Sequence, residues 1–323
     1  MSVISVNPIE SICIPQDVMN RFEIKIPASI ANLGPGFDTL AVAVQLYLTL
    51  RVRKMHGSGS VEFHFLDHEL RGENYIERAY RALAGESFAR LPSLSVEVRT
   101  EIPMCAGLGS SAAATVAGLR LYESVAGPLP LPMLLNVACA LESHPDNAAA
   151  SLLGGLALSC QLPDGTVHAT RFPWPDSMGF VVLTPHTPLT TGESRAVLPE
   201  SISRADAVFN LQRVALLLQS LHSGDFSQLR HALGDRLHQP ARQKIVPLLA
   251  RALELEHRDL CGVCLSGSGP SIVAIAQRSQ REIGELLGSL CHGAGVGYSV
   301  RTLQVHHEGS EYVPICRSGL LCC

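Results

Sequence analysis

The stretch PMCAGLGSSAAATVAGL, residues 103–119, constrains the fold of this chain more than any other segment. Gly107 and Gly109 permit backbone angles that other residues avoid, and they leave room for a ligand to approach the main chain. Ser110 or Ser111 then suits the N-cap of a helix, and the alanines that follow favour helix. Because the preceding LSVEVRTEI alternates like a strand, we predict a strand, a glycine loop and a helix in succession.

Such a loop points free N–H groups and the positive end of a helix dipole at one spot, which favours an anion, above all a phosphate. No lysine follows the glycines, so the loop lacks the Walker A pattern. GLGSSA (107–112) matches the loose dinucleotide pattern, but proline-rich GPLPLPMLLN stands where that pattern needs a strand ending in an acidic residue, about 20 residues on. From this stretch alone, phosphate binding and close packing of a helix on a sheet are equal alternatives.

The composition narrows the class of protein. A length of 323 residues suits two compact domains, and 46% apolar with 17% charged residues predicts a globular chain. The formal net charge of −4, without blocks of like charge, argues against a nucleic-acid partner and a polybasic membrane surface. No apolar run has the length of a membrane span, and no signal-peptide pattern begins the chain. The 10 scattered cysteines lead us to expect a cytoplasmic protein without disulfides or a zinc site.

Periodicity predicts mixed helices and strands in both halves of the chain, which indicates an α+β fold. Strands are expected within 22–54, where two flank a turn-rich loop, and at 61–66, 94–102, 154–161, 167–172, 178–185, 262–276 and 299–307, with a glycine loop inside 262–276. Helices are expected at 74–86, from residue 110 onward, and at 131–144, 205–222, 225–256 and 281–295.

Three separated motifs occur in the order and spacing of the GHMP kinase superfamily: PASIANLGPGFDTL (27–40), PMCAGLGSSAA (103–113) and LSGSGPS (265–271). The chain resembles these small-molecule kinases over nearly its whole length. Further elements resemble the homoserine kinase branch, namely ANLGPGFD, SHPDN followed by LLGG, TGESRAVLP and LHQPAR. The chain departs from the usual pattern at Cys105, where arginine is common, at Ala41, and in the alanines after SHPDN.

The resemblance implies a two-domain GHMP kinase fold. Residues 20–172 correspond to an ATP-binding N-terminal domain like domain 2 of ribosomal protein S5, with a left-handed β-α-β crossover. Residues 173–310 correspond to a ferredoxin-like C-terminal domain, and 311–323 to a tail. The third motif, GSGPS (267–271), is expected to support the phosphate loop from the second domain.

The resemblance also implies ATP and Mg²⁺ as cofactors and L-homoserine as the phosphoryl acceptor, with O-phospho-L-homoserine, a precursor of threonine, as product. The nucleotide positions that it implies are Asn74, Pro103, Gly107, Leu108, Gly109, Ser110, Ser111 and Ala112. Ser111 and Glu142 match the metal ligands, with Ser110 a close second to Ser111, and one hydroxyl and one carboxylate suit Mg²⁺. Asn74 is equally well read as the N-cap of the helix that follows it.

For the acceptor, the resemblance points to charged side chains that match an amino acid. Arg195 and Arg242 suit its carboxylate, because guanidinium groups bind carboxylates bidentately. Asn32, Asp38 and His144 match positions that contact the ammonium and hydroxyl groups, and Asp38 is counted with the residues of the chemical step. No catalytic base is evident, because Asp146 is near in sequence but is equally well a loop-shaping residue.

Three alternatives remain open at this point. The first is a kinase of another small hydroxyl compound such as threonine. The second is a non-catalytic homologue that keeps the ligand pocket, and the least favoured is a nicotinamide-dependent oxidoreductase. The expected partners are small molecules, and a homodimer is the assembly that the resemblance suggests.

Overall fold

The computed structural model describes residues 21–314, apart from 68, 70–71 and 293. Its strands are β1 (Arg21–Ala31), β2 (Leu40–Ser58), β3 (Val61–Phe65), β4 (Pro92–Thr100), β5 (Leu156–Gln161), β6 (Val167–Phe172), β7 (Gly179–Pro185), β8 (Leu260–Leu265), β9 (Ile272–Ala276), β10 (Tyr298–Leu303) and β11 (Glu311–Pro314). Its helices are α1 (Tyr75–Ala84), α2 (Ser110–Ala126), α3 (Leu131–Glu142), α4 (Asp146–Leu153), α5 (Thr191–Ala196), α6 (Arg204–Ser223), α7 (Leu229–Ala232), α8 (Gln239–Arg242), α9 (Pro247–Leu253) and α10 (Gln280–His292), with a 3₁₀ turn η1 (Gly85–Arg90).

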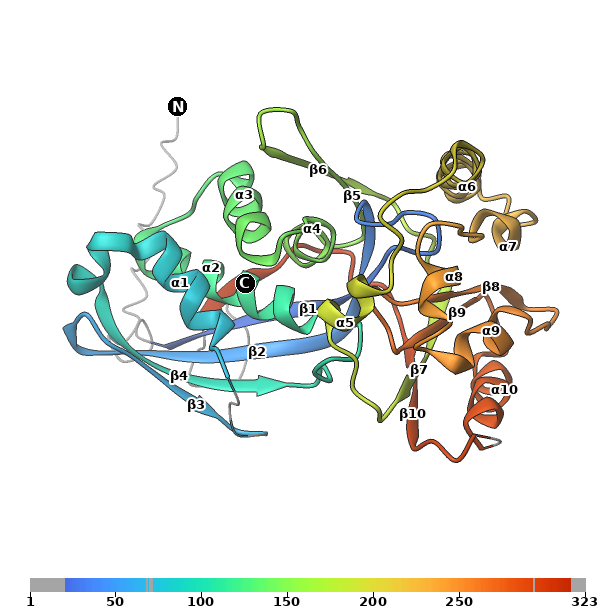
Figure 1. Cartoon of the computed structure of the whole chain (residues 1–323). Helices are drawn as coiled ribbons and strands as arrows, with labels where there is room; N and C mark the ends of the chain where they lie inside the picture. The colour runs from blue at the N-terminus through green and yellow to red at the C-terminus, as the bar shows by residue number, and fades with distance from the viewer. Residues whose placement is uncertain (1–20, 68, 70–71, 293, 315–323) are drawn as a thin grey trace, which may run out of the picture.

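Six strands from the first half of the chain, together with β11 from near its end, build a 7-stranded sheet in the order β11-β1-β2-β4-β3, in which β5 pairs with the start of β2 and β6 with β5. The long strand β2 pairs with β5 near its beginning and with β4 near its end. The chain runs from β3 through α1 to β4, and these two strands are parallel. Helices α1 to α4 lie together over this part of the molecule (Figure 1).

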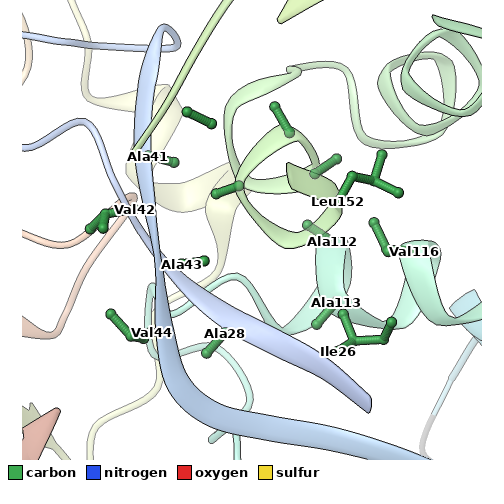
Figure 2. Packing of buried hydrophobic residues seen from close by; sticks show 14 of the residues in the cluster. Ile26, Ala28, Ala41, Val42, Ala43, Val44, Ala112, Ala113, Val116 and Leu152 are labelled. Carbon is green, nitrogen blue, oxygen red and sulfur yellow. The ribbon is translucent and has the colours of Figure 1, made fainter. Parts of the chain in front are cut away.

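Small side chains let α2 pack closely on the sheet and on α4, as Figure 2 shows for Ala113 of α2 beside Ile26 of β1 and for Ala112 of α2 on the side of Leu152 of α4. All four side chains are buried. Such close packing fixes where the N-terminal end of α2 lies, because protein interiors leave few voids into which a helix can shift.

The second half builds a 4-stranded antiparallel sheet in the order β10-β7-β9-β8, with α9 and α10 packed against it. If β7, β8, β9 and β10 are numbered 1 to 4 in chain order, they lie across the sheet in the order 4-1-3-2. This is the strand order of a ferredoxin-like sheet. The structure therefore confirms the predicted α+β class and the ferredoxin-like order of the second sheet. Helix α5 lies between the two halves of the molecule (Figure 1).

Several local predictions are wrong. The expected helix at 225–256 is divided into α7, α8 and α9, because Pro240 and Pro247 stand in the first turns of α8 and α9 and proline is poorly tolerated inside a helix. Helix α4 is absent from the sequence-based expectations. The N-cap of α2 is Gly109, in the left-handed region, and not a serine.

The chain passes from the first sheet to the second between β6, which ends at Phe172, and β7, which begins at Gly179. Residues 311–314, expected to belong to a tail, pair with β1 as strand β11, and residues 315–323 lie outside the described residues. Within the described part of the chain, no helix has the length and apolar character to cross a bilayer.

Candidate active site

A cavity of about 680 Å³ lies where the two halves of the molecule meet. Most of the predicted site residues line it: Asn32, Asp38, Asn74, Gly107, Gly109, Ser110, Ser111, Glu142, His144, Arg195 and Arg242. Pro103, Leu108 and Ala112 do not, and the Leu108 and Ala112 side chains belong to the hydrophobic core instead. The structure thus brings together segments more than 200 residues apart in the sequence.

The glycines of the loop before α2 were expected to leave room for a ligand, but neighbouring protein atoms are what exclude a side chain at both positions. Gly107 and Gly109 have φ values of +73° and +70°, which favour glycine. A Cβ at Gly107 would overlap the backbone oxygen of Ser266, and one at Gly109 would overlap Ser29 Oγ. Protein atoms, and not open ligand space, therefore occupy the room that the two missing side chains leave.

The second glycine loop, between β8 and β9, supports the first, as the third motif predicts. Ser266 Oγ donates to the Gly107 oxygen at 2.6 Å, and the Ser271 N–H donates to the Ala106 oxygen at 3.3 Å. The Gly267 N–H donates to the Ala31 oxygen at the end of β1 at 3.0 Å. These bonds hold the glycine loop at the N-terminus of α2, where a helix favours an anion.

Glu142, at the end of α3, offers a carboxylate to the same pocket. Its Oε1 accepts a hydrogen bond from Thr115 Oγ1 at 2.7 Å, and Arg78 Nη2 lies 3.6 Å from that oxygen. Oε2 has no hydrogen-bond partner within the described part of the chain. Ser110 and Ser111 line the pocket with it, so one carboxylate oxygen and a hydroxyl are present together, which fits Mg²⁺ beside a phosphate. No pattern in the sequence indicated Arg78 or Thr115.

Asn74 is the N-cap of the helix that follows it, and its nucleotide role stays a prediction. Its Oδ1 accepts hydrogen bonds from the Ile76 and Glu77 N–H groups at 3.1 and 3.3 Å, so it is the N-cap of α1. It also lines the cavity, beside the aromatic side chains of Phe65 and Tyr75.

Asp38 and Arg195, which line the same cavity, pair with each other. Arg195 Nη2 and Nη1 donate to the two carboxylate oxygens of Asp38 at 2.6 and 3.1 Å. Asn32 Oδ1 accepts from the Asp38 N–H at 3.2 Å, and Asn32 Nδ2 donates to the Gly267 oxygen at 3.0 Å. Two opposite charges predicted to bind the two ends of a zwitterion thus lie side by side, about one-third exposed.

Arg242 is almost fully buried, with 2% of its surface exposed, yet it lines the cavity. Its Nη1 donates to the Gly267 oxygen at 2.9 Å and contacts His238 Nδ1 at 3.1 Å, and its Nε donates to the Ser194 oxygen at 3.4 Å. Burial, and then the charge of Arg195, lower the pKa of Arg242 to about 10, so it stays a cation at neutral pH.

His238 is a neighbour that was not predicted, although it lies in the quoted LHQPAR element. Its Nε2 lies 2.8 Å from the Gly34 oxygen, and its ring stacks on Phe37. Burial lowers the pKa of His238, so the ring is neutral. A neutral ring with its proton on Nε2 leaves Nδ1 to accept from Arg242, which orients that guanidinium.

His144 also lines the cavity and is held by Asp146, whose side chain is buried. His144 Nδ1 lies 2.9 Å from Asp146 Oδ1, and the same oxygen accepts from the Asn147 N–H at 2.7 Å. Burial lowers the pKa of His144, but the hydrogen bond and charge of Asp146 raise it more, so the net shift is upward. Asp146 therefore orients His144 as well as opening α4.

Comparison with known proteins agrees with this geometry. Residues 74–155 match the model of the GHMP kinase N-terminal domain and residues 217–292 that of the GHMP kinase C-terminal domain. The chain is 39% identical to the homoserine kinase of Solibacter usitatus, over 82% of this chain and 88% of the relative. It is 41% identical to that of Deinococcus radiodurans, over 78% and 83% of the two chains. The chain belongs to the homoserine kinase family.

The fold supports the same family. The crystal structure of homoserine kinase from Cytophaga hutchinsonii superposes with a TM-score of 0.80 and 25% sequence identity, covering 95% of this chain and 100% of that one. Members of the homoserine kinase family are kinases, so the chain is an enzyme of the phosphotransferase class.

Proposed function

We propose that this chain transfers the γ-phosphoryl group of ATP to the side-chain hydroxyl of L-homoserine, giving O-phospho-L-homoserine for threonine synthesis. One observation carries the proposal. A single cavity holds the N-terminus of α2 and Glu142 together with an acidic and two basic side chains, Asp38, Arg195 and Arg242. The first set suits a nucleotide phosphate, and the second suits an amino-acid zwitterion.

In this proposal the main-chain N–H groups around Gly109 and Ser110 hold the ATP phosphates. Glu142 with Ser111 holds Mg²⁺, which when bound neutralises the charge that develops on the phosphates. The part of the cavity between Glu142 and Asp38 sets the distance between the nucleotide phosphates and the acceptor. Phosphoryl transfer depends mainly on such positioning, so the chain needs no covalent intermediate.

Arg195 and Arg242 bind the α-carboxylate of the acceptor, and Asp38 binds its ammonium. Asp38 and Arg195 lie 2.6 Å apart, so the positive and the negative end of a zwitterion would each find an opposite charge in the same place. A neutral alcohol has no charges to match these, which favours an amino-acid acceptor. Asn32 and His144 are then the polar side chains left to contact the hydroxyl.

The test is a coupled ADP-release assay with homoserine, threonine, serine and mevalonate side by side. We expect kcat/KM for homoserine to exceed the others by about tenfold or more, because an acceptor that cannot make one of the charged or hydrogen-bonded interactions forfeits on the order of 1.4 kcal/mol. A higher value for another acceptor would make the chain a kinase of that compound. ATP binding without turnover of any acceptor would make it a non-catalytic homologue.

A further inference from the structure

Side chains of two other helices, α1 and α2, contact one oxygen of the Glu142 carboxylate. Thr115, on α2, has no exposed surface, and its Oγ1 donates to Oε1 at 2.7 Å. Arg78, on α1, approaches the same oxygen at 3.6 Å. Both contacts converge on Oε1, so Oε2 is the oxygen left for a ligand.

Arg78 is itself fixed at several points. Its Nη1 donates to Glu73 Oε2 at 3.0 Å, and its Nη2 donates to the Leu141 oxygen at 3.1 Å, in the last turn of α3. Its guanidinium also lies 4.4 Å from the ring centroid of Tyr75, which lines the cavity. The cation therefore joins α1 to the end of the helix that carries Glu142, where a positive charge is favourable.

We infer that Thr115 and Arg78 are positioning residues for the metal carboxylate: they fix Oε1 of Glu142 so that Oε2 faces the nucleotide phosphates. The inference rests on the proposed function, in which Glu142 holds Mg²⁺. Its physical basis is general, because side chains that hydrogen-bond a metal ligand fix its orientation and raise the affinity of the site. A carboxylate held only by its own rotamers would lose entropy on binding the ion.

The Thr115 hydroxyl gives the sharpest test. Thr115→Val keeps the branched shape and removes the donor, whereas Thr115→Ser keeps the donor. Mn²⁺ is used as the probe, with its binding to the whole enzyme and ADP measured by electron paramagnetic resonance. We expect Thr115→Val to weaken Mn²⁺ binding by about tenfold to a hundredfold, the range for removing the support of a metal ligand. Thr115→Ser should bind Mn²⁺ like the wild type.

Arg78→Met is the second variant, at a side chain that is 27% exposed and thus safer for folding. Its matched control is Arg81→Met on the same helix, which removes an exposed ion pair with Glu77. We expect Arg78→Met, and not the control, to raise the Mg²⁺ concentration for half-maximal turnover by about tenfold while the KM for homoserine changes little. A role in folding alone would lower the melting temperature and leave this metal dependence unchanged.

The outcomes separate the two proposals. Wild-type Mn²⁺ binding by folded Thr115→Val, or an unchanged Mg²⁺ dependence in Arg78→Met, would overturn the positioning role and leave the proposed function intact. A wild-type enzyme that binds no Mn²⁺ with ADP, or that phosphorylates no acceptor, would overturn both.

Discussion

At the scale of single residues, the proposed role of Arg195 is to select an acceptor that has a carboxylate. Arg195→Met should lower kcat/KM for homoserine by about 30-fold, or roughly 2 kcal/mol, because the variant loses one of the two charged donors proposed for the carboxylate and keeps only Arg242. The KM for ATP should change little. The same variant should barely change the low activity toward 3-amino-1-propanol, which has no carboxylate. If the preference for homoserine over that amine is undiminished in Arg195→Met, Arg195 does not bind the carboxylate.

Arg242 is proposed to bind the same carboxylate but is almost fully buried, so we expect two effects when it is replaced. Arg242→Ala should raise the KM for homoserine far more than that for ATP, and it should also lower stability. The second effect follows because the Gly267 and Ser194 oxygens and His238 lose their donor. Steady-state kinetics with each substrate, together with urea unfolding, would measure both effects. A KM for homoserine equal to that of the wild type would remove Arg242 from the acceptor site.

Glu142→Gln tests the metal carboxylate directly. The amide keeps the size of the side chain and can still pair with Thr115, but it lacks the charge that Mg²⁺ needs. Turnover should fall by about a hundredfold or more while the melting temperature stays close to that of the wild type. Full activity with a normal magnesium dependence would show that the metal is held elsewhere.

His238 predicts a pH dependence of stability. Burial lowers its pKa below the usual 6.5, so the unfolded chain takes up a proton before the folded one does. Stability should therefore fall as the pH drops from about 6.5 toward the lower pKa of the folded state. Urea unfolding at several pH values would measure this slope, and His238→Gln should reduce it. Some slope should remain, since burial also lowers the pKa of His306; an unaltered slope in His238→Gln would contradict the assignment.

At the scale of elements, the glycine loop before α2 binds the second glycine loop through Gly107. Gly224 has the same φ of +73° at the end of α6, but a Cβ there meets nothing within 4 Å. Gly224→Ala should therefore report backbone strain alone, about 1 to 2 kcal/mol. Gly107→Ala should lower the free energy of unfolding by more than Gly224→Ala does, because its Cβ would displace the backbone at Ser266 and Gly269.

The displacement has a functional consequence. Gly267, in the displaced loop, bonds both Asn32 and Arg242. Calorimetry should thus show weaker binding of homoserine as well as of ATP in Gly107→Ala, and normal binding of both in Gly224→Ala. Weakened ATP binding with unchanged homoserine binding would mean that the two loops move independently.

At the scale of the whole molecule, the two sheets share a hydrophobic core. Phe180, Val273 and Ile275 of the second sheet belong to the same buried cluster as Ile24 and Leu50 of the first. Such continuity predicts one cooperative unfolding transition by calorimetry, with calorimetric and van't Hoff enthalpies equal. Homoserine should raise the melting temperature of that single transition, because the proposed acceptor site combines Asp38 of the first half with Arg195 and Arg242 of the second. Two resolved transitions would show that the halves unfold separately.

The sequence by itself determined the class of fold, most of the elements and the composition of the site. Apolar periodicity located the long strands and helices, and the glycine loop before an alanine-rich helix indicated an anion site, because both signals depend on neighbouring residues. The resemblance to GHMP kinases then supplied candidates such as Asp38, Glu142 and Arg242, which do line one cavity.

Only the tertiary structure decided how those residues are held. Thr115 and Arg78 meet Glu142 from separate helices, His238 orients Arg242, and Asp38 pairs with Arg195 across 157 positions of sequence. No local pattern encodes such contacts, because they follow from the packing of sheets and helices far apart in the chain. The left-handed N-cap at Gly109 has the same origin, since a side chain there would overlap Ser29 of β1. The division of 225–256 into short helices is different, because Pro240 and Pro247 are visible in the sequence itself.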